Sequence, residues 1–188
     1  MKVLIIDNYD SFTYNLAHYI EPLADELAVV RNDEISLKEV EKYDAVVLSP
    51  GPGLPEDTGI SKEVVRRYAR TKKILGVCMG MQLIAEVFGG KLRNLDDPLH
   101  GIAIETIQTG VPHDLFRDVP LKFLSGRYHS WVVDEQTLPP ELLITATDVL
   151  GLPQALKHKN FALSAVQFHP ESVLTEHGRK IIENWIRY

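Results

Sequence analysis

The sequence predicts an α/β protein built on an open, mostly parallel sheet flanked by helices, with antiparallel strands added in the second half. In the first half, short apolar runs rich in Val, Ile and Leu alternate with segments of helical periodicity. That alternation is typical of a parallel sheet with helices on both faces. In the second half, apolar runs follow one another with turns between them, and only the last segment has strong helical periodicity.

The first half supplies the parallel strands and the helices that connect them. KVLIID at 2–7 is a nearly continuous apolar run, as expected for a strand buried on both faces. Asp10 or Ser11 is a suitable N-cap for the first helix, and Ser36 for the second. Strands are expected at 2–7, 26–31, 44–49 and 73–78, and helices at 11–20, 36–43, 60–70 and 81–90.

The second half is expected to extend the same sheet with antiparallel strands. Turns separate its apolar runs, and no helix of comparable strength lies among them. No repeat, low-complexity segment or linker divides the chain, so residues 1–188 are expected to form one domain. Strands are expected at 102–108, 121–126, 141–148, 152–158 and 161–168, and a final helix at 176–188.

Composition narrows the class of protein before any motif is considered. The chain has 188 residues and a formal net charge of −6, and no stretch is rich in Lys and Arg, so nucleic acid is not an expected partner. Its apolar runs are too short to cross a bilayer, and the N-terminus lacks the pattern of a signal peptide. A single cysteine cannot form an intrachain disulfide. These features predict a cytoplasmic protein that is not inserted in a membrane.

The single cysteine lies at a predicted strand-to-helix corner. Gly76-Val77-Cys78-Met79-Gly80 has the G-x-C-x-G form of a nucleophile elbow, in which a tight turn lifts the side chain above the end of the sheet. The turn crowds the positions two residues before and after the nucleophile, which is why glycine suits both. The N-terminus of the next helix favours a thiolate, and the N–H of Met79 would be free to bind an oxyanion. The alternative is a buried structural cysteine.

A thiol nucleophile requires a base, and His169 is the best placed of the seven histidines. It follows the predicted strand 161–168 in the sequence QFHPES. In an extended segment, residues two apart project to the same side, so Glu171 is expected beside His169, where it would orient the imidazole and stabilise its cationic form. The alternative is a turn histidine before a proline, with a solvated glutamate.

Other polar segments are expected at the same edge of the sheet. The loop LSPGPG follows a strand directly, so N–H groups of Gly51 or Gly53 could supply a second oxyanion donor, worth about 3 kcal/mol of barrier. A plain tight turn is the alternative, and the lack of a Lys-Ser/Thr ending excludes a P-loop. Gln82 either binds a polar substrate or faces solvent. The segment at 126–131 is read as a polar-aromatic loop that either binds substrate or is a routine turn. The aromatic segment at 7–15 is typical of an interface, with a place in the core as the alternative for Phe12.

Together these motifs resemble the class I, triad-type glutamine amidotransferases. The resemblance rests on Cys78 in GVCMGMQ, on the LSPGPG loop and on VQFHPES, and it extends over essentially the whole chain. The opening IDNYDSFTYNL and the RYHS segment resemble the glutaminase subunits of chorismate-using synthases, which make anthranilate or aminodeoxychorismate. The resemblance implies the amidotransferase fold with its flavodoxin-like core. It also implies hydrolysis of L-glutamine and delivery of ammonia to a separate chorismate-binding synthase subunit in a heteromer.

The resemblance also implies residue roles. Cys78 would be the nucleophile, His169 the base and Glu171 the orienting acid. The other residues would hold glutamine. Its amide oxygen and the oxyanion would be bound by the turn Gly51, Pro52 and Gly53 and by the N–H of Met79. Its amino-acid end would be bound by Gln82, Ser130 and Trp131. No cofactor is expected in this chain, and magnesium is expected in the partner synthase subunit. The segment 8–15 and the region around His100-Gly101 would lie toward that partner.

The sequence departs from the family pattern at two positions. Met81 stands where the chorismate-using branch usually has His, although other triad amidotransferases carry Met there. Ile102 stands where Lys often follows His-Gly, a difference that concerns coupling to the partner more than hydrolysis. Two functions from other classes are also open, as is an amidotransferase with a different acceptor, such as a nucleotide. A flavodoxin-like binding protein would contain flavin, and a catalytically inactive regulatory subunit would release no glutamate.

Overall fold

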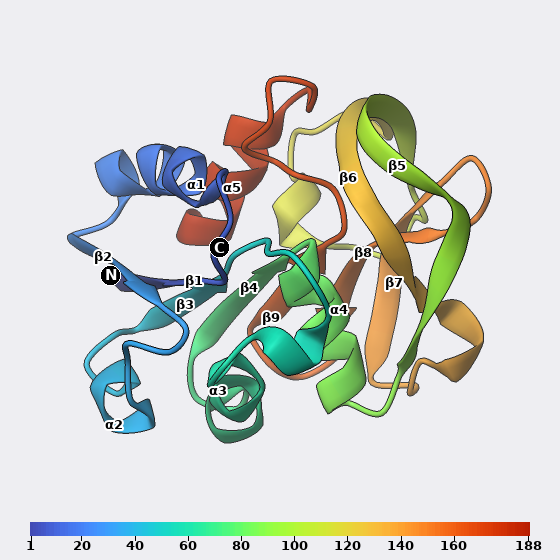
Figure 1. Cartoon of the computed structure of the whole chain (residues 1–188). Coiled ribbons are helices and arrows are strands. Elements are labelled where there is room, and N and C mark those ends of the chain that lie inside the picture. Colours follow the sequence, from blue (N-terminus) through green and yellow to red (C-terminus); the bar gives the residue numbers. More distant parts are fainter.

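The computed structural model describes residues 1–188 and contains one nine-stranded mixed sheet (Figure 1). Its first four strands along the chain, together with the last, form the parallel half, and the other four are antiparallel additions. In spatial order the strands are β2 (Glu26–Arg31), β1 (Lys2–Asp7), β3 (Ala45–Leu48), β4 (Lys73–Val77), β9 (Leu163–Val166), β8 (Pro153–His158), β7 (Leu142–Asp148), β5 (Lys91–Gln108) and β6 (Lys122–Asp134).

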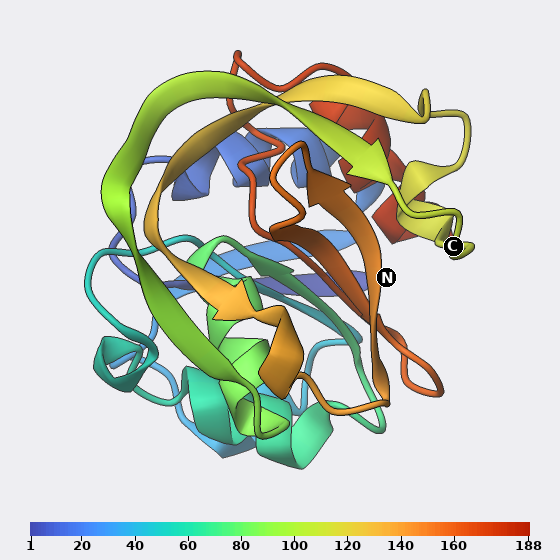
Figure 2. The same cartoon turned by 90° about the vertical axis from the view of Figure 1, so that its right-hand side faces the viewer.

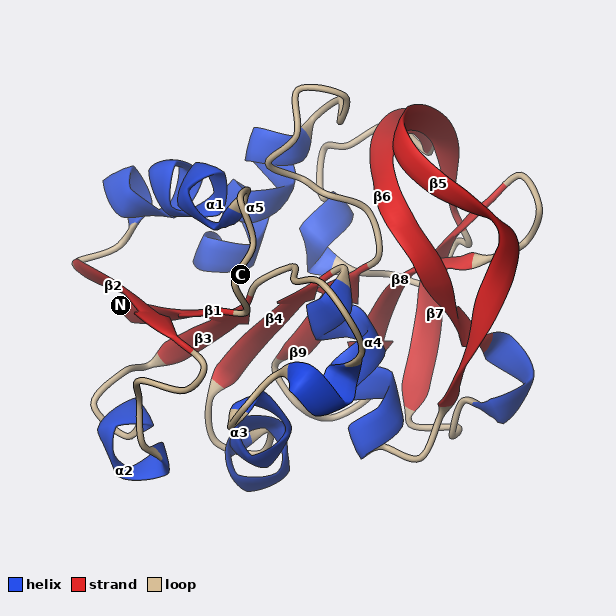
Figure 3. Ribbon diagram, viewed as in Figure 1, coloured by secondary structure: helices blue, strands red, loops and turns tan.

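Helices cover both faces of the parallel half (Figure 3). On one face lie α1 (Thr13–Ile20) and α5 (Gly178–Arg187), and on the other lie α2 (Leu37–Val40), α3 (Ser61–Tyr68) and α4 (Met79–Val87). Alternate residues of a strand point to opposite faces. In β1, accordingly, Val3 and Ile5 enter the cluster beneath α1 and α5, whereas Leu4 and Ile6 enter the cluster beneath α3 and α4. The apolar strand 2–7 is therefore buried on both sides, as predicted.

Of the two predicted helix N-caps, the one at Ser36 is confirmed and the one at Asp10 or Ser11 is wrong. Ser36 and Glu39 form a capping box at α2, with Glu39 accepting hydrogen bonds from the Ser36 N–H and hydroxyl. The N-cap expected for α1 is wrong, because that helix starts at Thr13 with Phe12 as cap. Asp10 instead accepts a hydrogen bond from the Phe12 N–H in the turn that precedes the helix. Helix α4 starts at Met79, directly after the cysteine, and not at residue 81.

The hairpin of β5 and β6 is longer than expected. Residues 126–131 were predicted as a loop, but they lie inside β6, and β5 begins eleven residues before the predicted strand at 102–108. The two strands form one end of the sheet and curl together away from the other strands (Figure 2), with register shifts between Asn94 and Leu99 and between His100 and Ile102. Hydrophobic periodicity failed here because β6 buries polar side chains, among them Arg127, at 0% exposure.

The last strand also differs from the prediction of an antiparallel addition. β9 pairs in parallel with β4, with Ile74 opposite Leu163 and Val77 opposite Val166, and only its other edge is antiparallel to β8. Two parallel neighbours end at the same edge of the sheet. This arrangement places the residue after β4, Cys78, beside the segment after β9, which contains His169.

Candidate active site

The residue that follows β4 adopts the strained conformation of an elbow. Cys78 has φ of 53° and ψ of −103°, and its N–H donates a hydrogen bond to the carbonyl oxygen of Val166 at 2.8 Å. A Cβ on Gly76 would lie 2.5 Å from the carbonyl oxygen of Gly80, and one on Gly80 would lie 2.4 Å from that of Leu48. Both glycines are thus required by close backbone approach, as the G-x-C-x-G reading predicts.

The first turn of α4 faces the sulfur. Met79 is the first residue of the helix, so its N–H belongs to the group of N–H donors that have no partner within the helix. The partial positive charge of a helix N-terminus favours an anion nearby. Cys78 itself is only 6% exposed. A thiolate and an oxyanion would both be stabilised at this position.

His169 and Glu171 lie in a turn that follows β9. The Nδ1 atom of His169 is 2.7 Å from Oε1 of Glu171, and both side chains are almost completely buried. The sequence predicts this pairing, but from an extended segment. The structure has a turn instead, in which the N–H of Ser172 donates to the carbonyl oxygen of His169. On the other side of the ring, Nε2 is buried without a regular hydrogen bond, so it is the nitrogen left for reacting atoms.

The charge state of His169 is set by competing effects. Burial of the imidazole opposes its protonation, but the negative charge and hydrogen-bonding capacity of the Cys78 sulfur, and after them Glu171, outweigh burial. The pKa of His169 is therefore raised well above its usual range. An imidazolium paired with a thiolate is the arrangement that activates a cysteine nucleophile.

Two aromatic rings pack against the imidazole. The centroid of Tyr128 lies 4.8 Å from that of His169, and Phe12 lies 5.4 Å away, both in edge-to-face geometry. Phe12 and Tyr128 also contact each other, and Tyr128 meets His100 on β5. The aromatic segment at 7–15 and the region of His100 and Gly101 are therefore joined through Tyr128 beside the histidine.

A cavity of about 150 Å³ opens beside the sulfur. It is lined by every residue that the family resemblance assigned to glutamine binding, whereas the buried His169 and Glu171 do not line it. Tyr128 and His129, which the sequence reading left unassigned, also line it. The complete lining is Gly51, Pro52, Gly53, Cys78, Met79, Gln82, Tyr128, His129, Ser130 and Trp131.

The glycine loop on one side of this cavity is held rigidly. A Cβ on Gly51 would lie 2.6 Å from the carbonyl oxygen of Asn8, and Gly53 has φ of +82°. The side chain of Asn8 donates to the carbonyl oxygen of Ser49 at 2.9 Å, and the Asn8 N–H donates to the Ser49 hydroxyl at 2.8 Å. These bonds connect the loop after β3 to the segment after β1, so its backbone is fixed before any ligand binds.

Gln82 does not face solvent, which was one of its two expected placements. It is 3% exposed, and its Nε2 donates to the carbonyl oxygen of Trp131 at 2.8 Å. The same nitrogen lies 3.3 Å from Oε1 of Gln167, a residue that the sequence reading left without a role. The only available signal for Gln167 was its place two residues before His169 at the end of a buried strand.

The two departures from the family pattern lie in different surroundings. Met81 is completely buried in the core beneath α3 and α4, so it does not border the cavity. Ile102 is 43% exposed on β5, in the part of the chain where the hairpin curls away from the other strands. Of the two, only Ile102 is available to a partner.

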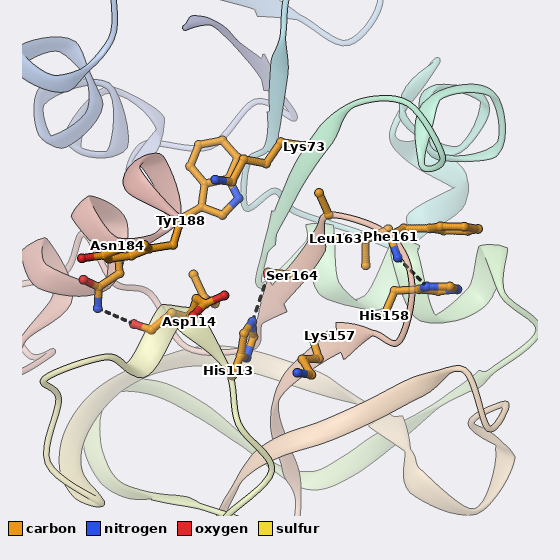
Figure 4. A pocket seen from close by; sticks show the side chains of 13 residues that line it. Lys73, His113, Asp114, Lys157, His158, Phe161, Leu163, Ser164, Asn184 and Tyr188 are labelled. Atoms are coloured by element: carbon orange, nitrogen blue, oxygen red, sulfur yellow. Dashed lines mark hydrogen bonds between the residues drawn. The ribbon is translucent and has the colours of Figure 1, made fainter.

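A second cavity, of about 170 Å³, lies at the opposite edge of the sheet, where β4 and β9 begin (Figure 4). Lys73, Lys157 and His113 line it. His113 is bonded at both ring nitrogens, to Thr145 at 2.8 Å and to Ser164 at 2.9 Å. Burial, and then the charge of Lys157, lower the pKa of His113 to about 3. This neutral, fully bonded histidine is no base, and the cavity contains no nucleophile comparable to Cys78.

The side chains of His, Cys, Asp and Glu form no group of three or more that could hold a metal ion. No helix has both the length and the apolar composition needed to span a bilayer.

Comparison with known proteins points to one family. The family model for glutamine amidotransferase class-I matches residues 4–187. The chain is also similar in structure to a putative GMP synthase protein from Thermoplasma acidophilum, with a TM-score of 0.88, 26% identity, and coverage of 99% of this chain and 92% of that one.

The curated relatives include proteins of about the same length as this chain and a much longer bifunctional protein. The chain is 46% identical to anthranilate synthase component 2 of Lactococcus lactis, over 98% of this chain and 93% of the relative. It is 40% identical to the aminodeoxychorismate/anthranilate synthase component 2 of Bacillus subtilis, over 98% and 95%. It is also 46% identical to the bifunctional protein TrpGD of Thermotoga maritima, but it spans only 32% of that protein's length.

Proposed function

The chain belongs to the class I glutamine amidotransferase family, and we propose that it is the glutaminase subunit of a chorismate-using synthase. The observation that carries the proposal is the meeting of the Cys78 elbow with the His169–Glu171 pair at one edge of the sheet. The similarity to anthranilate synthase component 2 and to aminodeoxychorismate/anthranilate synthase component 2 supports the choice of acceptor.

In the proposed mechanism, glutamine occupies the cavity beside Cys78. The thiolate attacks the side-chain amide carbon, and the N–H groups of Met79 and the Gly51–Gly53 loop stabilise the tetrahedral oxyanion. His169 donates its proton to the departing ammonia, which leaves a γ-glutamyl thioester. A water molecule, deprotonated by His169, then attacks the thioester carbonyl, and collapse of the tetrahedral adduct releases glutamate and expels the Cys78 thiolate, which is again paired with the His169 imidazolium.

Substrate contacts follow from the cavity lining. We assign the amino-acid end of glutamine to Gln82, Ser130 and Trp131. Because the amide nitrogen of Gln82 is already bonded to the Trp131 carbonyl, its amide oxygen is the atom left to accept a hydrogen bond from the substrate ammonium. Pro52 contributes shape to the glycine loop and no donor.

The proposal extends to the partner and the surroundings of the protein. Ammonia passes to a separate chorismate-binding subunit in a heteromer, and the aromatic segment at 8–15 with His100 and Gly101 faces that subunit. Exposed Tyr9 and Tyr14, at 49% and 64%, suit such an interface. We assign no cofactor to this chain, place magnesium in the partner subunit, and place the complex in the cytoplasm.

A coupled assay tests this function. The chain is mixed with glutamine, chorismate, magnesium and each candidate synthase subunit from the same cell, and the product is identified by chromatography. Anthranilate, aminodeoxychorismate or both would support the proposal and define the product. Glutamate release with no amination of chorismate would overturn the choice of acceptor, and absence of glutamate release in every mixture would indicate a purely regulatory subunit.

A further inference from the structure

Gln167 lies beside the sulfur of Cys78 and two residues before His169 in the sequence, and no step of the proposed mechanism uses it. It directly follows β9 and is completely buried. Its backbone N–H donates to the carbonyl oxygen of Gln154 on β8 at 2.9 Å, which fixes the main chain. Its side-chain Nε2 lies 3.6 Å from the Sγ atom of Cys78, within hydrogen-bonding range for sulfur.

The orientation of the Gln167 amide is determined by a chain of contacts. The carbonyl oxygen of Trp131 can only accept, so the group of Gln82 that lies 2.8 Å from it must be the NH₂. The same NH₂ lies 3.3 Å from the Gln167 side chain, which must therefore present its oxygen there. The remaining end of the Gln167 amide, its NH₂, is then the group that points to the sulfur.

We propose that Gln167 stabilises the anionic sulfur of Cys78 by donating a side-chain N–H, and that Gln82 holds it in the donating orientation. The inference rests on the proposed glutaminase function and adds a residue to its site. A donor aimed at a sulfur is more strongly bound by the thiolate than by the neutral thiol. The same donor stabilises the thiolate when it leaves the γ-glutamyl thioester, so it assists both halves of the reaction.

Alkylation of the free enzyme tests the inference without relying on turnover. The rate of reaction with iodoacetamide is measured against pH for wild type and Gln167→Leu, which removes the donor at similar volume. We expect the midpoint of the rate profile to move upward by about one pH unit, the effect of losing one hydrogen bond to a charged group. Glutaminase kcat is expected to fall about tenfold with KM changed less than threefold. An unchanged midpoint would overturn the inference.

Gln154→Leu is the matched control, because Gln154 is also a completely buried glutamine and its nearest side-chain partner is Asp148, at 3.4 Å. Its profile should equal that of wild type, and an equal shift would show a general packing effect and overturn the inference. If Gln167→Leu does not fold, Gln82→Met removes the orienting group and should shift the midpoint in the same direction by a smaller amount. No shift in a folded Gln82→Met would count against the inference. A wild type that releases no glutamate would remove the proposed function while leaving the alkylation result intact.

Discussion

Glu171 contacts His169 through one carboxylate oxygen, and its other oxygen is buried without a partner. Oε1 lies 2.7 Å from Nδ1 of the imidazole, whereas Oε2 is buried without a hydrogen-bond partner. A buried carboxylate with only one of its oxygens hydrogen-bonded lowers the stability of the folded protein. The benefit of Glu171 is therefore its effect on His169, whose pKa it helps to raise. With Nδ1 held by Glu171, Nε2 of His169 is the ring nitrogen that has no partner within the protein.

Glu171→Gln is expected to lower kcat for glutamate release by about 10³-fold, since a neutral amide no longer stabilises the imidazolium. Glu171 helps to raise the pKa of His169, so its loss lowers that pKa. Protonation of the departing ammonia requires the imidazolium. The alkaline limb of the kcat/KM profile should therefore move to lower pH, and an alkaline limb that stays in place would contradict the assigned role.

Cys78→Ser should abolish glutamate release, with a loss of at least about 10⁴-fold, because a serine hydroxyl is far less acidic than a thiol. The site itself should persist. Serine is similar in size to cysteine, and the elbow is fixed by Gly76, Gly80 and the bond from the residue 78 N–H to Val166. Glutamate release is measured with and without the synthase subunit, and far-UV circular dichroism checks the fold. Normal turnover by the folded variant would exclude Cys78 as nucleophile.

Gly80→Ala is expected to destabilise the protein by about 2–3 kcal/mol, although alanine normally stabilises a helix interior by up to about 1 kcal/mol. The steric term dominates because the new Cβ would lie 2.4 Å from the carbonyl oxygen of Leu48, a backbone atom that cannot rotate away. Gly89→Ala is the control. Nothing lies within 4 Å of its Cβ, so only the strain of φ +94° remains, about 1 kcal/mol. Urea unfolding compares the two, and equal stabilities would refute the steric explanation.

Local sequence signals predicted the Cys78 elbow and the His169–Glu171 pair, because each of these features depends on residues that are neighbours in sequence. The elbow around Cys78 requires glycine two residues away on each side, and the pairing of His169 with Glu171 is set by a single turn. The order of strands in the sheet has no such local signal. β9 lies parallel to β4, a strand that is more than 80 residues earlier in the sequence. Apolar periodicity predicts that a strand forms, but it does not indicate which other strand it pairs with.

The long hairpin was mispredicted for a different physical reason. Arg127 is completely buried, and it is stabilised by hydrogen bonds to the hydroxyls of Ser125, at 2.6 Å, and Thr106, at 2.9 Å. A polar residue is normally expected at the surface, because burial requires a hydrogen-bond partner. One partner of Arg127, Thr106, lies on the other strand of the hairpin, so the sequence around Arg127 gives no sign of it. Gln167 escaped notice for the same reason, since its partners, Cys78 and Gln82, are distant in sequence.

His129 should make the protein less stable as the pH falls. Its imidazole is 7% exposed, and burial, followed by the positive charge of Arg127, lowers its pKa to about 3. In the unfolded chain the pKa is about 6.5. Between these values the unfolded state binds a proton and the folded state does not, so stability falls on acidification from about pH 6.5 toward pH 3. For this one histidine, the free energy of unfolding changes by at most about 1.4 kcal/mol per pH unit.

His129→Asn should flatten that decline. The asparagine amide can still donate to the Trp131 carbonyl, which His129 Nδ1 contacts at 3.1 Å, and it binds no proton in either state. The free energy of unfolding is measured by urea titration at pH 7, 5.5 and 4. His18→Asn is the control, because it makes the same substitution at an exposed histidine. A variant at position 129 whose stability falls as steeply as that of wild type would mean that other buried groups, such as His113, account for the acid sensitivity.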